Sequence, residues 1–400
     1  MNTRQRGLIL PALLVVLIIG GLAFMLGQNG LGEAAQSRRH LLTLRALAEA
    51  RAALIGYAQT YHHSHPDSTI GFLPCPDLDL ASGDGNAEGT CGATGLFSVG
   101  RLPYRTLGLS PLRDGAGECL WYAVAGTFKN RFPAGYVTWD TAGQFTLTLA
   151  DGTVLNPGGA RQRAVAVVFA AGRPTASQQR GTSAHRCSGN PDAAVALAAY
   201  LENALTPQSA PYAITLGSPD SPINNDTLAW VAADEVFSDE LIEQRADFAA
   251  FINTMLGDLE GALGTHPDPA PQPFTVPGQS LPPNVEAGTL PAGDASSEGQ
   301  IFARYAAWGD QLRYFRCTDL TLCLQADVGA GPETCTRVII FAGRIQPGQD
   351  RSPASPATPL ATAYFEGGNV PAVLEAIPPF TGPTTYVGTN AGQDLVRCIK

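Results

Sequence analysis

Basic residues are scarce in this chain of 400 residues, which has 25 Lys and Arg against 35 Asp and Glu and a formal net charge of -10. Because nucleic-acid phosphates require a clustered basic surface, this balance argues against a nucleic-acid partner. The sequence also lacks the G-x-S-x-G, H-E-x-x-H and P-loop patterns. We therefore expect no enzyme and no resident cofactor, apart from the calcium considered below.

No two cysteines form the C-x-x-C spacing of a zinc or redox site. Their even number, and their position after an apolar N-terminal segment, favour four disulfides in an oxidising compartment. We expect Cys75 to pair with Cys91 and leave the other pairings open. The eight cysteines are Cys75, Cys91, Cys119, Cys187, Cys317, Cys323, Cys335 and Cys398.

Glycine and proline are plentiful, at 44 and 31 residues, which favours short strands and many turns over a helical bundle. The N-terminal region is different. Residues 8–27 read LILPALLVVLIIGGLAFMLG, without a charge, which is long enough for a helix to cross a bilayer. Arg4 and Arg6 precede this segment, so the positive-inside rule predicts a cytoplasmic N-terminus and an exterior remainder. A cleaved signal peptide is the alternative, although GQNGLGEAA is a poor cleavage site.

An amphipathic pattern follows directly over residues 33–61, with Leu44, Leu47, Leu54 and Ala58 on one stripe. One continuous helix from Leu8 to about residue 63 is therefore expected, with an apolar first half and a second half on which a head domain can pack.

The segment RQRGLILPALLVVLIIGG resembles the leader of type IV prepilins and type II secretion pseudopilins. The resemblance implies that a prepilin peptidase cuts after Gly7 and methylates Leu8, and that the chain assembles with other pilin or pseudopilin subunits. It also implies a single pass through the inner membrane, with most of the chain in the periplasm or an extracellular filament. The runs LPCPD, GRLP and TLGL resemble a series found in proteobacterial prepilin-like proteins.

Two residues depart from the pilin pattern, because Leu8 replaces the usual Phe and Ala12 replaces the usual Glu. That glutamate neutralises a neighbour's N-terminal ammonium inside the apolar helix bundle. A subunit without it suits the tip of a filament, as in the tip pseudopilin of type II secretion. The alternative is an ordinary anchored protein.

The exterior part is expected to be α+β, with an antiparallel β head on the long helix. The predicted units are a leader (1–7), a transmembrane helix (8–27), its amphipathic continuation (28–63), a first head (64–264), a Pro-rich linker (265–298) and a second, smaller head (299–400). Within the first head we expect strands at 119–128, 144–149, 164–170 and 227–232, a helix at 191–204 after an Asn190 cap, and a helix from a Ser238 cap to about 263.

The second head resembles a partial repeat of the first. The run VVFAAGR at 167–173 aligns without gaps on VIIFAGR at 338–344, and further matches occur in the same order. These are Gln178 and Arg180 with Gln349 and Arg351, Tyr200 and Glu202 with Tyr364 and Glu366, and Gly117, Leu120 and Tyr122 with Gly309, Leu312 and Tyr314.

Asp77, Asp79 and Asp84 lie in a Gly-rich loop between Cys75 and Cys91. Their oxygens suit calcium, although the spacing is not that of a regular calcium loop, and a solvated acidic loop is the alternative.

Two other groups are interpreted as structural. His62, His63 and His65 lie at the expected helix C-terminus, where imidazoles are favourable and neighbouring side chains diverge, so no metal site is expected there. The series Gly172 to Arg180 and Gly343 to Arg351 could bind an anion or glycan, but it is expected to shape a turn and pair with acids such as Glu202 and Glu366.

The predicted function is a structural subunit, a minor pilin or pseudopilin at or near a filament tip that helps assembly or adhesion. A permanently anchored periplasmic or surface binding protein is the alternative, and an anchored hydrolase comes third.

Overall fold

The computed structural model describes the backbone of residues 9–65, 70–78, 84–93, 95–129, 137–157, 159–180, 187, 193–219, 221–267, 269–273, 280–319, 322–349, 351, 361–376 and 379–400. The side chains of residues 9–16, 18–31, 160 and 193–196 are not described. Within this described part, no helix is both long enough and apolar enough to cross a membrane. The expectation of a span at 8–27 stays a prediction.

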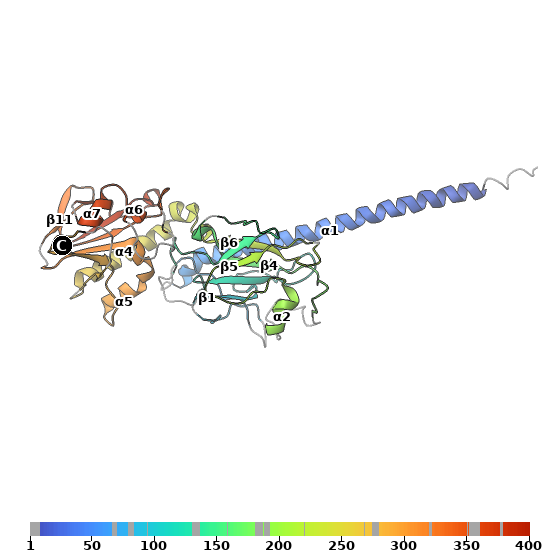
Figure 1. The fold of residues 1–400 in the computed structure, drawn as a ribbon, viewed down its shortest axis with the longest axis horizontal. Coiled ribbons are helices and arrows are strands. Elements are labelled where there is room, and N and C mark those ends of the chain that lie inside the picture. Colours follow the sequence, from blue (N-terminus) through green and yellow to red (C-terminus); the bar gives the residue numbers. More distant parts are fainter. Residues whose placement is uncertain are drawn as a thin grey trace, which may run out of the picture.

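The first described element is one long helix, α1 (Ile9–Ser64), of 56 residues, which extends far beyond the rest of the molecule (Figure 1). At 1.5 Å per residue it is about 84 Å long. Pro11 lies in its first turn, where a missing N–H is tolerated, and the next proline is Pro66, just past its end. Its C-terminal part packs on the first sheet through the buried residues Ala46, Leu47, Ala50, Leu54 and Ala58, whose spacing forms one helical face.

The first unit is built on a six-stranded sheet in the order β1-β2-β4-β3-β5, with β6 also paired to β4. The strands are β1 (Gly95–Arg101), β2 (Trp121–Gly126), β3 (Phe145–Thr148), β4 (Ala164–Ala170), β5 (Tyr212–Thr215) and β6 (Thr227–Ala232). The central strand β4, AVAVVFA, is buried at every residue, and α1 packs against it. All four strands expected from the sequence are present.

Short helices complete this unit, and a longer one follows it. They are η1 (Ala160–Gln162), α2 (Ala193–Tyr200), α3 (Ala233–Val236), the π-helical turn η3 (Glu240–Gln244) and α4 (Ala246–Thr265). The helix expected from Ser238 is interrupted at Arg245, whose backbone is extended. Ser238 caps only the π-helical turn, accepting from the Leu241 N–H at 3.3 Å. The expected Asn190 cap lies outside the described residues.

The second unit has a five-stranded sheet, β14-β12-β9-β8-β7, and a three-stranded sheet, β11-β10-β13. The strands are β7 (Gln272–Pro273), β8 (Val285–Thr289), β9 (Leu312–Cys317), β10 (Leu324–Asp327), β11 (Pro332–Cys335), β12 (Arg337–Phe341), β13 (Phe380–Thr381) and β14 (Leu395–Ile399). The helices are α5 (Ser297–Arg304), η4 (Ala306–Gln311), α6 (Ala361–Tyr364), α7 (Asn369–Glu375) and η5 (Gly388–Asn390). The molecule is therefore a mixed α+β protein with several sheets.

The segment expected as a linker, 265–298, differs from the prediction because it contributes two strands. β8 pairs antiparallel with β9, and β7 pairs with β8 at the edge of the sheet. An edge strand tolerates Pro273, since its missing N–H removes no interior ladder bond. The sequence VEAGT supplies the inner strand, and the prolines are confined to its flanks and the edge.

The two units repeat one topology, and the strand registers agree residue by residue. Tyr122 of β2 pairs with Val168 of β4 and Gly100 of β1. Tyr314 of β9 pairs in the same way with Ile339 of β12 and Gly288 of β8. The sheet order β1-β2-β4-β6 thus matches β8-β9-β12-β14. A helix precedes and packs on each sheet, α1 on β6 and α4 on β14.

The units are joined by a continuous apolar core rather than by a flexible connection. Trp139 of the first unit contacts Trp308 and Phe341 of the second, with ring centroids 5.3 and 5.6 Å apart. Tyr386 donates its hydroxyl to the Ile242 carbonyl at 2.9 Å, and its N–H to Asn253 at 2.8 Å. Figure 1 shows the second unit at the opposite end of the first from the extended part of α1.

Candidate functional site

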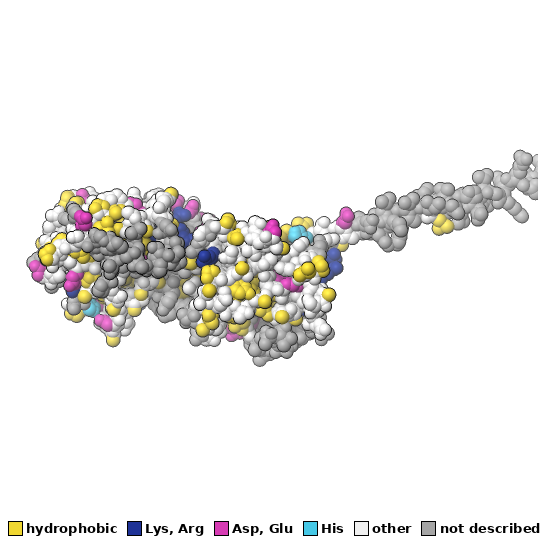
Figure 2. Space-filling model, viewed as in Figure 1, with side chains coloured by type: hydrophobic (Ala, Val, Ile, Leu, Met, Phe, Trp, Pro, Cys, Tyr) yellow, Lys and Arg dark blue, Asp and Glu magenta, His cyan; other side chains and the backbone are white. Residues whose placement is uncertain are grey.

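The predicted processing site, Gly7 and Leu8, lies outside the described residues. On the same helix, the structure describes the surface of the part of α1 just before it enters the first unit. Leu41, Leu42 and Leu44 have exposed fractions of 66%, 48% and 43% there. Figure 2 shows hydrophobic, basic and histidine side chains together at the end of the head from which α1 emerges. The helix therefore offers apolar surface that the first unit does not cover.

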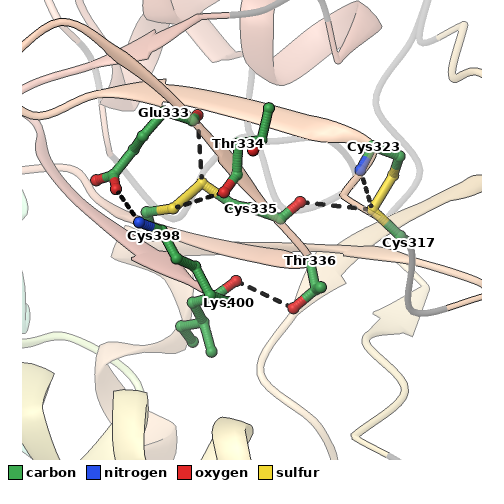
Figure 3. Close-up of a disulfide and its surroundings, with 9 residues drawn as sticks. Cys317, Cys323, Glu333, Thr334, Cys335, Thr336, Cys398 and Lys400 are labelled. Atoms are coloured by element: carbon green, nitrogen blue, oxygen red, sulfur yellow. Dashed lines mark hydrogen bonds and ion pairs between the residues drawn. A yellow bond between two sulfur atoms is a disulfide. The ribbon is translucent and has the colours of Figure 1, made fainter.

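The eight cysteines form four disulfides, all within one unit or the other. Cys75 pairs with Cys91, as expected, and Cys119 pairs with Cys187. In the second unit the pairs are Cys317 with Cys323 and Cys335 with Cys398. Figure 3 shows the last two near each other, with Lys400 and Glu333 forming an ion pair of 2.8 Å beside them.

The acidic loop expected to suit calcium uses its described carboxylates as turn acceptors. Asp77 is buried and accepts from the Gly85 N–H at 2.9 Å. Asp84 is exposed and accepts from the Asn86 N–H at 2.8 Å and from its side-chain amide, and these hydrogen bonds lower the pKa of Asp84. Asp79 lies outside the described residues. Calcium binding by this loop stays a prediction.

A buried arginine organises the loops of the first unit. Arg180 is 5% exposed and donates to the carbonyls of Gly172 (2.8 Å), Ala199 (3.1 Å) and Tyr200 (3.3 Å), and it forms an ion pair of 3.2 Å with Glu118. Its guanidinium lies 4.9 Å from the centroid of the Tyr200 ring. Because backbone carbonyls occupy these donors, the arginine holds the loop in place rather than presenting charge to a ligand.

The second unit contains the same arrangement around Arg351. This arginine is 1% exposed and donates to the carbonyls of Gly343 (2.9 Å), Ala363 (2.9 Å) and Tyr364 (3.2 Å). Its acid partner differs in origin, because Arg351 forms its ion pair of 3.0 Å with Asp140 of the first unit. The structure therefore supports the turn-shaping interpretation of both series.

Glutamine and glutamate side chains extend each arginine cluster, although the expected acids do not pair with the arginines themselves. Gln178 donates to Glu202 at 2.8 Å, and Gln349 donates to Glu366 at 2.7 Å. The expected acids thus join the networks through the glutamines, while the ion pairs with arginine come from Glu118 and Asp140.

A pair of carboxyl groups closes the network in each unit. In the first unit, Asp226 Oδ2 accepts from the Glu202 N–H at 3.0 Å and from Asn203 at 3.2 Å. Glu202 Oε2 and Asp226 Oδ1 are buried and accept no hydrogen bond from another described residue, and a single proton shared between the two carboxyls satisfies both. Burial, together with the neighbouring Glu202 carboxylate, raises the pKa of Asp226 to about 7.

The second pair has the same bonds. Asp394 Oδ2 accepts from the Glu366 N–H at 3.0 Å and from Asn369 at 2.9 Å. Burial, together with the hydrogen bond to Glu366, raises the pKa of Asp394 to about 8. The two asparagines also act alike, since Asn203 accepts from the Thr215 N–H and Asn369 from the Thr381 N–H, at 2.9 and 2.8 Å.

Sequence reasoning found the arginines, glutamines, tyrosines and glutamates of this repeated network but missed its aspartates and asparagines. Asp226 and Asp394 occupy corresponding positions just before β6 and β14, where no gapless match marks them. A further repeat of short sequence, which would have indicated the correspondence of β1 with β8, was also missed. GRLP at 100–103 matches GTLP at 288–291, and the two glycines have the same register in their sheets. Gly100 and Gly288 are both crowded, since an added Cβ would lie 2.8 Å from the Asp77 carbonyl or 1.9 Å from the Gln272 carbonyl.

The histidines at the end of α1 are joined by a residue that sequence reasoning did not connect to them. Asp247, near the start of α4, lies 3.0 Å from His63 and 3.9 Å from His62 through its Oδ2 atom and their Nε2 atoms. His65 instead stacks on Tyr61, with ring centroids 3.9 Å apart. Within the described residues, His62, His63 and Asp247 are the single group of three His, Cys, Asp or Glu whose ligand atoms converge within 4.8 Å.

Two cavities also occur in the described part of the molecule. One of about 590 Å³ lies where α1 emerges, between Arg39 and His40 of the helix and Arg173 and Asn225 of the first unit. The other, of about 780 Å³, is lined by Arg161 and Glu243 of one unit and by Arg344 and Gly388 of the other. Arg344 forms an ion pair of 3.5 Å with Glu243 there.

No protein-family model, no curated protein and no solved structure matches this chain.

Proposed function

We propose that this chain is a minor pilin-like or pseudopilin-like subunit, anchored in the inner membrane by residues 8–27 and assembled through α1 at or near the tip of a short filament. The observation that carries the proposal is the division of α1 into two parts. From Ala46 onward one face is buried against the first sheet, whereas Leu41, Leu42 and Leu44 are exposed just before it. A helix of this kind can pack on a head with one part and on neighbouring helices with the other.

The N-terminal sequence supports the same role. Residues 8–27 carry no charge and follow Arg4, Arg6 and Gly7, as in a prepilin leader. Ala12 cannot supply the carboxylate that pairs with a neighbouring subunit's ammonium, and a tip position requires no such pair.

Four disulfides suit an exterior location, because disulfides persist in the periplasm and on cell surfaces. The two units would then face outward, where they contact a surface or another subunit. We also propose that the second unit arose by duplication of the first, which explains the shared registers and the repeated arginine network.

The mature N-terminus tests processing. Mass spectrometry of the membrane-extracted chain should find N-methylated Leu8, whereas the Gly7→Ala variant should keep its leader and Gly20→Ala, a matched control, should be processed normally. An intact Met1 in the wild type would reject the prepilin assignment.

Filament incorporation tests the exposed part of α1. The Leu41→Ser/Leu42→Ser variant should be lost from sheared filament fractions while remaining in the membrane. Leu322→Ser is the control, because Leu322 is 56% exposed and belongs to the second unit. Equal incorporation of both variants would contradict assembly through this surface.

The cavity of about 590 Å³ beside α1 favours the second candidate, an anchored binding protein that does not polymerise. For that function, Met1 would remain intact and the chain would be absent from sheared filaments.

A further inference from the structure

The most informative unassigned cluster joins the last turn of α1 to the first turn of α4. His63 and Asp247 are 184 residues apart in the sequence, yet their Nε2 and Oδ2 atoms lie 3.0 Å apart. The His62 Nε2 atom lies 3.9 Å from the same oxygen. Three ligand atoms from two separate elements therefore converge on one point.

The chemical set of these ligands selects a class of cation. Two imidazole nitrogens and one carboxylate oxygen suit Zn²⁺ and similar divalent transition metals, whereas Ca²⁺ and Mg²⁺ prefer oxygen ligands. At metal–ligand distances of 2.0–2.1 Å, two tetrahedral ligands lie roughly 3.3 Å apart. The two His–Asp separations of 3.0 and 3.9 Å lie on either side of that value, and all three ligand atoms lie within 4.8 Å of one another.

Accessibility is also suitable. The His62 side chain is 12% exposed and its Nδ1 atom makes no hydrogen bond to a described residue, whereas the His63 side chain is 51% exposed. His62 is therefore partly buried, and the exposed His63 leaves a path for an ion from solvent. Three protein ligands leave a fourth position for water.

One neighbouring group opposes the ion. Arg245 donates to both carboxylate oxygens of Asp247, at 3.1 and 2.6 Å, and its charge disfavours a second cation at the same oxygen. The arginine must release Oδ2 when a metal binds, so its replacement should strengthen binding.

We propose that His62, His63 and Asp247 bind one divalent transition-metal ion, with Zn²⁺ as the type, and that the ion fastens the end of α1 to the start of α4. This site is independent of filament assembly, since it lies within one subunit.

The test is a titration of the full chain in detergent with Co²⁺. The visible absorption of Co²⁺ reports tetrahedral ligation by nitrogen and oxygen. Zn²⁺ is then added to displace the bound Co²⁺. One equivalent should bind. His63→Ala and Asp247→Asn should each weaken binding by more than about 100-fold, beyond the roughly 10–100-fold cost of altering a group outside the ligand set.

Two variants serve as controls for this site. His65→Ala alters a histidine on the same helix end that is stacked on Tyr61, and should bind the metal as the wild type does. Arg245→Gln should bind more tightly. Absence of a saturable Co²⁺ spectrum, or unchanged binding in both His63→Ala and Asp247→Asn, would overturn the proposal, and circular dichroism verifies that these variants are folded.

Discussion

Each unit contains one buried arginine that organises its loops, but the acid that pairs with this arginine comes from a different place in each unit. In the first unit, the buried Arg180 pairs with Glu118, which lies just before β2 of that unit. In the second, the alignment that matches Leu120 with Leu312 places Asp310 at the corresponding position, yet Arg351 pairs with Asp140 across the junction. The backbone acceptors are the same in both units. The carbonyl contacts therefore define the repeated fold, whereas the acid partner decides whether a unit is self-contained or joined to its neighbour.

The tyrosine next to this arginine is also flanked by a second arginine in each unit, and the second arginine comes from a different strand. Tyr200 lies between Arg180 and Arg101, whose guanidinium carbons are 4.9 and 4.6 Å from its ring centroid. Tyr364 lies near Arg351 and Arg313, at 4.8 and 5.4 Å. Arg101 belongs to β1, but Arg313 belongs to β9, which corresponds to β2. The same ring environment is thus produced from different strands.

The largest expected difference between the units comes from removing the acid partners. Asp140→Ala leaves Arg351 buried without its counter-charge, which typically costs about 3–5 kcal/mol. Because that pair crosses the junction, calorimetry should show the units unfolding in two separate transitions. Glu118→Ala should destabilise the first unit and leave the junction intact. A single shared transition for both variants would remove the distinction between them.

The disulfides should differ next, according to the length of chain that each closes. Cys119–Cys187 and Cys335–Cys398 span 68 and 63 residues, whereas Cys317–Cys323 spans 6. On the chain-entropy model, replacing either long-range pair by serine costs about 4 kcal/mol and replacing the short one about 2 kcal/mol. Urea unfolding of the three double variants measures this. Equal losses would show that loop length does not control their contributions.

The carboxyl pairs predict that the stability of both units depends on pH. The folded pKa values of Asp226 and Asp394 are raised, so their contribution to stability is complete below the ordinary value of 3.8 and declines as pH rises. The contribution is lost above about 7 for Asp226 and above about 8 for Asp394.

Asparagine at these positions mimics the protonated acid, since its amide can donate to the partner glutamate. Asp226→Asn and Asp394→Asn should each flatten the dependence of unfolding free energy on pH in its own window, as measured by urea titrations from pH 5 to pH 9. A wild-type curve that neither substitution alters would show that the shared protons do not contribute.

The smallest effect is expected at the exposed ion pair between Lys400 and Glu333, whose side chains are 66% and 32% exposed. Solvent screens this pair, so Lys400→Ala should change the unfolding free energy by less than about 1 kcal/mol. Comparing the losses of unfolding free energy in Lys400→Ala and Asp140→Ala distinguishes the contribution of an ion pair at the surface from that of a buried ion pair at the junction. A loss as large as that of Asp140→Ala would contradict this ranking.

The sequence predicted the parts of the fold that local pattern determines. The apolar runs of β4 and β12, the amphipathic stripe of α1 and the match of Arg180 with Arg351 could all be recognised directly. The strands of the linker segment were missed because Pro and Gly dominate its composition, whereas pairing with β9 determines its conformation. The pairing of Cys75 with Cys91 followed from proximity, but the long-range pairs depend on the sheet registers.

The candidate site was predictable only where its residues lie in matched runs. The partner of Arg351, the aspartates of the carboxyl pairs and the aspartate beside His63 are brought together by tertiary packing. No spacing along the chain encodes Asp140 beside Arg351, since the two residues are separated by the whole of α4 and most of both sheets.

The placement of the disulfides determines how the molecule responds to tension. The extended end of α1 and the C-terminal residue lie at opposite ends of the molecule, so a pull between them loads the two units in series (Figure 1). Each unit is cross-linked internally, but no disulfide crosses from one to the other. The contacts across the junction include the aromatic rings around Trp139, the Tyr386–Ile242 hydrogen bond and the Asp140–Arg351 ion pair. We therefore expect these contacts to separate under tension before either cross-linked unit unfolds.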